Sequence, residues 1–175
     1  MKKKLRAVGI LTIASLLPFN TASGALASHT PMSDNLDSLG IAESNEDMSN
    51  GLIAEANTAE RGDSGTFVSV TWSVENNSGS EVYFGWPHGQ SYTYSDPTYY
   101  SGVTATSKDG ANRHHPLMDS TTECLCSGNT STEFLAIINP GEKVAYWSMY
   151  SVPEDVDAIT LEIPGFEPIE DIPIS

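Results

Sequence analysis

Residues 66–74 read TFVSVTWSV, and from Val68 onward apolar and small polar side chains alternate without exception. A period of two is the signature of a β-strand with one buried face, because successive side chains of a strand point to opposite sides. The pattern therefore predicts a strand whose buried face carries Val68, Val70, Trp72 and Val74. No segment after it shows the 3.6-residue period of an amphipathic helix.

The rest of the C-terminal part continues in the same style. Short apolar or alternating segments are separated by turn residues such as ENNSGS (75–80) and NPGE (139–142). We expect residues 133–138 and 143–150 to form a hairpin, and the strand after residue 80 to run back along 66–74. Pro173 suits an edge strand, where no backbone donor is needed. The further predicted strands are 81–86, 102–107, 133–138, 143–150, 157–163 and a last edge segment within 164–175.

About seven short strands with regularly spaced turns predict an all-β fold, an antiparallel immunoglobulin-like β-sandwich preceded by a disordered segment. The two cysteines do not follow the antibody pattern of one on each sheet around a tryptophan. We therefore expect the apolar core alone to hold the sheets together. Its predicted members are Val68, Val70, Trp72, Leu135, Ile137, Tyr146, Ile159 and Leu161.

The N-terminus has the layout of a secretory signal peptide. A lysine triplet at 2–4 is followed by a mostly apolar run, Val8–Phe19, and by a small-x-small cleavage signal at Ala25-Leu26-Ala27. The run is shorter than the roughly 20 residues of a membrane-spanning helix. We expect residues 1–27 to be removed and the chain to be secreted, either extracellular or associated with the cell wall.

Residues 28–64 are rich in Ser, Asn, Asp and Glu and contain no aromatic residue. Such a composition offers little apolar surface to offset the entropy of ordering, so we predict an acidic disordered spacer. The predicted organisation is a signal peptide at 1–27, the spacer at 28–64 and a β-sandwich domain at 65–175.

The mature chain is strongly acidic. All 23 Asp and Glu residues follow residue 27, against four Lys and Arg residues, which gives a net charge of −19. Such a surface repels nucleic acid and anionic lipid, so we expect neither as a partner.

A resemblance appears in the segments VTWSVEN, AIINPGEKVAYWSMY and SVPEDVDAITLEI. Together they resemble the telokin-like, immunoglobulin-fold domains of exported Gram-positive proteins. The Cys-x-Cys loop and the ending PGFEPIEDIPI are also similar to extracellular domains of actinobacterial proteins that carry an OmpA-like module, which is absent from these 175 residues. The resemblance covers about residues 66–175. It implies the sandwich fold and no catalytic residues.

The only cysteines, Cys124 and Cys126, lie one residue apart in the loop TTECLCSG (121–128). In an extended strand their Cα atoms would be about 6.6 Å apart, near the upper limit for a disulfide, so closure needs a bent backbone. Export favours oxidation, and we predict a local disulfide. Two alternatives use the same stretch: a redox pair, or a metal site that adds His114, His115 and Met118 as soft ligands.

A second candidate site is the aromatic segment FGWPHGQSYTYSDPTYYSG (84–102). Rigid amphipathic rings between small polar residues are typical of binding loops, and their faces can stack on sugars. The alternative is that several rings pack against the sandwich. The candidate ligand-binding residues are Trp86, Tyr92, Tyr94, Tyr99 and Tyr100.

Two short motifs match known sites by their letters. GDSG at 62–65 resembles a serine-protease nucleophile, but only His29 precedes Ser64 in the mature chain, so the His and Asp partners are missing. Arg61-Gly62-Asp63 matches an adhesion tripeptide by its letters alone, and we interpret the match as chance. We expect no enzyme, no cofactor and no metal. The predicted function is an exported binding module for a protein or a cell-wall glycan; the alternative is a metal-binding or redox protein that uses His114–Cys126.

Overall fold

The structure is a computed structural model that describes residues 36–88, 94–96, 98–108, 110–128 and 134–175. These residues form β-strands, with one short 3-10 turn, η2 (Asp47–Ser49), and no α-helix among them. The predicted signal peptide, 1–27, lies outside the described residues.

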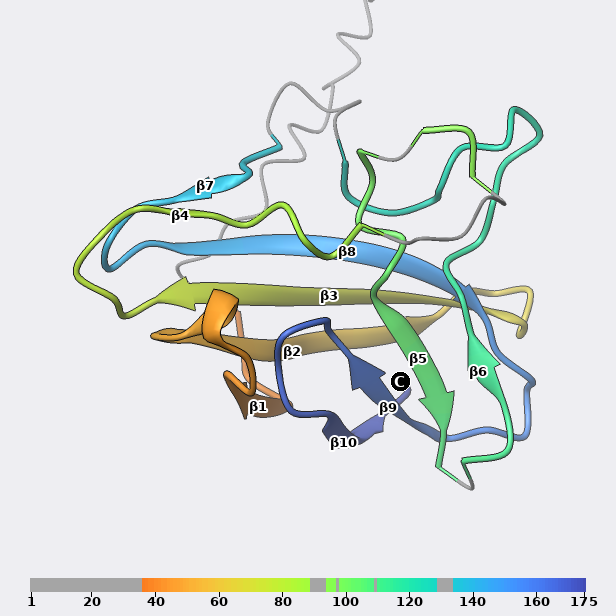
Figure 1. Cartoon of the computed structure of the whole chain (residues 1–175). Helices are drawn as coiled ribbons and strands as arrows, with labels where there is room; N and C mark the ends of the chain where they lie inside the picture. Colours follow the sequence, from red (N-terminus) through yellow and green to blue (C-terminus); the bar gives the residue numbers. More distant parts are fainter. Residues whose placement is uncertain (1–35, 89–93, 97, 109, 129–133) are drawn as a thin grey trace, which may run out of the picture.

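Two four-stranded antiparallel sheets pack face to face (Figure 1). The first has the order β1-β2-β3-β8 and the second β10-β9-β5-β6, while β4 and β7 pair as a separate ribbon. The strands are β1 (Gly40–Glu43), β2 (Leu52–Arg61), β3 (Phe67–Asn76), β4 (Val82–Tyr83), β5 (Thr104–Ser107), β6 (Arg113–His114), β7 (Ile137–Ile138), β8 (Lys143–Ser151), β9 (Ala158–Glu162) and β10 (Ile169–Pro173).

The predicted all-β antiparallel sandwich is confirmed, and the described residues form ten strands where about seven were predicted. The strand order differs in one respect from that of immunoglobulin domains. Here β1, β2 and β3 follow one another within one sheet. In immunoglobulin domains the third strand crosses to the opposite sheet.

The core lies between the sheets and is rich in aromatic residues. Trp72 on β3 is fully buried, and its ring centroid lies 4.7 Å from that of Tyr146, 6.1 Å from Tyr100 and 6.2 Å from Phe84. Six of the eight predicted core residues are buried. Leu135 and Ile137 are 47% and 50% exposed, so the prediction is wrong for them. Their segment forms the peripheral β4–β7 ribbon, which leaves one side open to solvent.

The predicted disordered spacer is wrong for most of its described part. Residues 52–61 form β2, which is central in its sheet and pairs with β1 and β3. Its inward face consists of Leu52, Ala54 and Ala56 and then, after a bulge between Ala56 and Thr58, Ala59. Alanines fill this face, so the composition of the segment resembled that of a polar linker. The bulge also breaks the period of two that would have indicated a strand. Residues 28–35 lie outside the described part.

Two predicted strand pairings are also wrong. β8 pairs with β3 over nine residues, from Phe67 opposite Ser151 to Glu75 opposite Lys143. β7 pairs with β4 instead of forming a hairpin with β8. The turn between β7 and β8 is nevertheless present, since Glu142 N–H donates to Asn139 O. The long in-register match of β3 with β8 takes the place of the local hairpin.

Both sides of the sandwich are closed by backbone pairing. At one side Ser175 N–H donates to Ala59 O, and Arg61 N–H donates to Ser175 O. At the other, Leu117 N–H donates to Met149 O and Met149 N–H donates to Leu125 O, so the cysteine loop covers β8. Pro173 lies on β10, an edge strand as predicted. Covered edges protect a sandwich from strand-to-strand aggregation.

Candidate interaction surface

Two of the predicted ligand-binding tyrosines are core residues. Tyr99 and Tyr100 are 2% and 0% exposed, and the Tyr100 hydroxyl donates to Phe84 O. Burial raises the pKa of Tyr100, as it does for Tyr146 beside it. Neither ring presents a face to solvent, so the prediction of ligand contact is wrong for both. The rings pack against the sandwich because the segment enters the aromatic core before β5.

The other predicted residues of this segment are partly buried or outside the described structure. Trp86 packs edge-on against Phe84, and its Nε1–H donates to Pro164 O at 2.9 Å. The Tyr94 hydroxyl donates to Pro116 O at 2.5 Å, and burial raises its pKa. Tyr92 lies outside the described residues. Trp86 and Tyr94 therefore anchor loops to the body of the domain.

The two cysteines form the predicted local disulfide, with a Cα–Cα distance of 5.3 Å. This distance is shorter than the extended value, so the backbone bends between them as expected. Both residues are buried and pack with Tyr99, and Tyr94 packs against this small cluster. Asp119 holds the hairpin tip: its carboxylate accepts from the Thr121 hydroxyl and backbone and from Glu123 N–H, and these bonds lower its pKa.

We expect the double substitution Cys124→Ser and Cys126→Ser to lower the free energy of unfolding by at least about 1.6 kcal/mol, the loop-entropy value for three closed residues, because two hydroxyls also enter the buried cluster with Tyr99. Chemical denaturation of both proteins measures it. Thiol titration of the unmodified, non-reduced protein should find no free thiol. Two titratable thiols together with bound zinc would contradict the disulfide and favour the metal alternative.

The metal alternative needs two free thiols, and in this structure both are in a disulfide, which is also one of the two states of a redox pair. Cys124 and Cys126 are bonded to each other, and His114 lies on β6 opposite Ala105, with its Nε2 atom buried and without a hydrogen-bond partner. Within the described residues no group of three or more His, Cys, Asp or Glu side chains is arranged to hold a metal ion. The sequence spacing brought potential ligands close along the chain but not around one point.

The adhesion tripeptide and the protease-like motif have structural explanations. The guanidinium of Arg61 donates to the carbonyls of Gly65, Val152 and Val156 at 2.6, 3.0 and 2.6 Å. It therefore joins the β2–β3 turn to the β8–β9 connection. Gly62 and Ser64 belong to that same turn.

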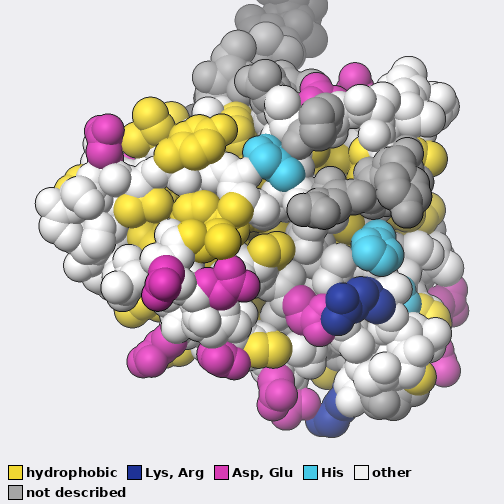
Figure 2. Space-filling view, viewed as in Figure 1, with side chains coloured by type: hydrophobic (Ala, Val, Ile, Leu, Met, Phe, Trp, Pro, Cys, Tyr) yellow, Lys and Arg dark blue, Asp and Glu magenta, His cyan; other side chains and the backbone are white. Residues whose placement is uncertain are grey.

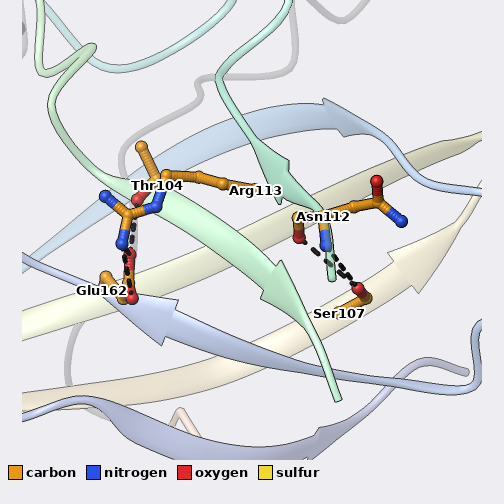
Figure 3. A network of polar contacts seen from close by, with 5 residues as sticks. All are labelled: Thr104, Ser107, Asn112, Arg113 and Glu162. Atoms are coloured by element: carbon orange, nitrogen blue, oxygen red, sulfur yellow. Dashed lines mark hydrogen bonds and ion pairs between the residues drawn. The ribbon is translucent and has the colours of Figure 1, made fainter. Parts of the chain in front are cut away.

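A pocket of about 470 Å³ lies where β6 meets the start of β3 and the end of β8. Arg113 borders it, but its guanidinium is paired with Glu162 at 2.7 and 2.9 Å, and Glu162 also accepts from the Thr104 hydroxyl (Figure 3). Asn112 is bound to Ser107 in the β5–β6 turn. These contacts hold adjoining strands together and do not form a nucleophile–base pair.

The outer face of the first sheet carries an apolar patch that the sequence analysis missed. On β8 the inward residues Ser148 and Tyr150 are buried, so Trp147 and Met149 point outward, and Trp147 is 39% exposed. Phe67 of β3, opposite Ser151, is 45% exposed on the same face. Leu117 and Leu125 follow beside β8, and both are partly exposed. We name Phe67, Leu117, Leu125, Trp147 and Met149 the β8 patch.

This patch could have been found from the sequence by asking what the second face of each strand carries. In KVAYWSMY, the residues between the inward-facing ones include Trp147 and Met149. A solvent-facing side of an antiparallel sheet is normally polar. A cluster of large apolar side chains there is typical of an interaction site.

A second apolar group, of three residues, lies on the β4–β7 ribbon. Tyr83 is 67% exposed and stands opposite Ile137, with Leu135 nearby along the chain. Figure 2 shows hydrophobic side chains gathered where Figure 1 places β4 and β7. We name Tyr83, Leu135 and Ile137 the ribbon patch.

Every Lys and Arg of the described residues has a partner within the chain. Lys108 pairs with Asp171 at 2.8 Å, Lys143 with Glu55 at 2.6 Å, Arg113 with Glu162, and Arg61 with backbone carbonyls. In Figure 2 the sparse basic side chains lie beside acidic ones. The surface charge offered to a partner is therefore negative.

Comparisons with known proteins add two remote likenesses. No family model and no curated protein matches the chain. A functionally unknown protein from Listeria monocytogenes EGD-e is 11% identical over 79% of this chain and 85% of its own, with a TM-score of 0.38. An uncharacterised β-sandwich protein from Clostridium difficile 630 is 14% identical over 79% of this chain and 97% of its own, with a TM-score of 0.36. At such scores neither protein supports an argument about this one.

Proposed function

We propose that the chain is an exported, non-catalytic binding module of the cell envelope or the extracellular space that recognises a protein or a cell-wall glycan. The observation that carries the proposal is the β8 patch, a group of large apolar side chains on the outer face of a regular sheet. The signal-peptide layout of residues 1–27 supports export. Within the described residues no helix is long and apolar enough to cross a membrane.

A rigid sheet suits recognition, because its side chains are held in fixed positions. Trp147 and Met149 extend from a nine-residue strand that pairs along its whole length with β3. Tryptophan and methionine are enriched at protein interfaces, and tryptophan at interface hot spots. Because these side chains stand on an ordered strand, the chain loses less conformational entropy on binding than a flexible loop would.

The proposal is tested by co-sedimentation with purified cell walls and by affinity capture from culture-supernatant proteins. We expect the exported chain to bind one of these fractions and the variant Trp147→Ser to lose at least ten-fold in affinity. Tyr83→Ser, which removes an exposed aromatic ring from the ribbon patch, is the matched control and should bind normally. If the chain bound to neither fraction, or if both variants bound as tightly as the parent, a role for the β8 patch would be contradicted.

A further inference from the structure

The β8 patch also has a chemical character that points to one class of partner. We infer that it docks a protein segment that is apolar at its centre and carries lysine or arginine at its rim. This inference rests on the proposed function, since it names the partner of the same surface.

The patch combines three aliphatic or sulfur-containing side chains with the more exposed aromatic rings of Phe67 and Trp147. Met149 lies on β8 between the levels of Trp147 and Phe67, which are four residues apart in the paired register of β8 and β3, and Leu125 lies beside Met149 on the side of β8 away from β3. A sugar chain is held by planar rings that stack on it, whereas flexible methionine and leucine adapt to apolar side chains. The composition therefore favours a protein segment over a glycan.

The charges around the patch are acidic. On β2, Glu60 is exposed and stands opposite Ser69, which is itself opposite Met149. At the other side, Asp119 and Glu123 occupy the tip of the hairpin that carries Leu117 and Leu125. On the sheet itself Lys143 is neutralised by Glu55. A cationic rim on the partner would complement this arrangement, while an anionic rim would be repelled.

The same charges argue against a second copy of the chain as the occupant. Two mature chains would each bring a net charge of −19. Each of their Lys and Arg side chains already has a partner within its own chain, so an ion pair across an interface would have to replace an existing one. A basic partner is attracted by the acidic surface and brings its own cations for ion pairs. The attraction would also speed its encounter with the patch.

The test uses a synthetic peptide of alternating leucine and lysine as the probe, with an alternating leucine–glutamate peptide and oligolysine as matched controls. Binding to the exported chain is followed by titration calorimetry and tryptophan fluorescence. We expect the leucine–lysine peptide to bind, to weaken at least ten-fold in Trp147→Ser/Met149→Ser, and to weaken as salt rises. The leucine–glutamate peptide should not bind, and Tyr83→Ser should bind as the parent does.

Several outcomes would overturn the inference. Equal affinity of the leucine–lysine peptide for the parent and the β8-patch variant would show charge attraction alone, as would oligolysine binding equally tightly. Preference for the leucine–glutamate peptide would show that the rim of the partner is negatively charged, which contradicts the inference. Binding of purified cell walls through Trp147 with no binding of the leucine–lysine peptide would overturn the basic partner but leave the proposed function intact. Thermal unfolding of each variant checks that the exposed substitutions leave the fold in place.

Discussion

Replacement of Trp72 by alanine is expected to lower the free energy of unfolding by about 3–5 kcal/mol, the range for truncating a buried aromatic residue. Trp72 is fully buried on β3 and contacts the rings of Phe84, Tyr100 and Tyr146. Its removal leaves a cavity at the point where these rings meet, and rings held by their own hydroxyl hydrogen bonds cannot easily close it. Small domains are stable by about 5–15 kcal/mol, so this loss would remove between about a fifth and all of the stability.

Trp147→Ala is the matched control for this substitution. Trp147 is the β8 partner of Thr71, the residue next to Trp72, but it points to the opposite face of the same sheet. The same chemical change there should cost less, about 1–2 kcal/mol, because the ring is 39% exposed and its removal leaves no enclosed cavity. Urea denaturation of the two variants compares them directly. Similar losses for both would contradict the assignment of inner and outer faces.

Arg61→Ala should be the second large effect, with a loss of about 2–4 kcal/mol. Charge-assisted hydrogen bonds contribute about 1.5–3 kcal/mol each, but three bonds from one guanidinium do not add fully. The substitution frees the carbonyls of Gly65, Val152 and Val156 and disconnects the turn after β2 from the β8–β9 connection. Thermal or urea unfolding measures the loss.

Two controls separate this structural role from the adhesion tripeptide. Arg61→Lys should recover part of the stability, because an ammonium group keeps the charge but lacks the guanidinium's planar, forked donor geometry. Asp63→Ala should change stability little, since Asp63 is exposed in the turn. If Arg61→Ala and Asp63→Ala instead reduced cell adhesion equally and left stability unchanged, the tripeptide would be functional and the structural role wrong.

The inward faces of the long strands were predictable from local pattern. In β3 the alternation after Val68 reaches the core without a break, and the structure buries Val68, Val70, Trp72 and Val74. A period-two pattern predicts the buried face correctly when the strand has no bulge and the opposite sheet covers one of its faces. The disulfide was predictable for a different reason, since two cysteines so close in sequence can meet whatever the fold.

β2 was missed because its signal is weak and interrupted. Alanines at 54, 56 and 59 count little in hydropathy, and the bulge before Thr58 shifts the inward positions by one. The strand is held instead by pairing on both sides and by the closing contact with Ser175. Such long-range pairing leaves no trace in a short window of sequence.

For the candidate site, too, local sequence did not show which side chains are buried and which are exposed. The aromatic segment looked like a binding loop, yet Tyr100 is buried in the aromatic core between the sheets and Tyr99 in the cluster of the two cysteines. Trp147 and Met149 looked like ordinary strand residues, yet they lie outside. Which face of β8 is covered depends on the second sheet, and that sheet comes from distant parts of the chain.

The sequence by itself determined the all-β class, the inward face of β3, the turn before β8 and the local disulfide. All of these depend on residues within a few positions of one another, through alternation, turn chemistry and chain proximity. Only the tertiary structure decided that β2 is a central strand, that β8 pairs with β3, that Tyr99 and Tyr100 are core, and that Trp147 faces solvent. The physical reason is that burial is set by what packs against a face, and the residues that pack there are far away in the chain.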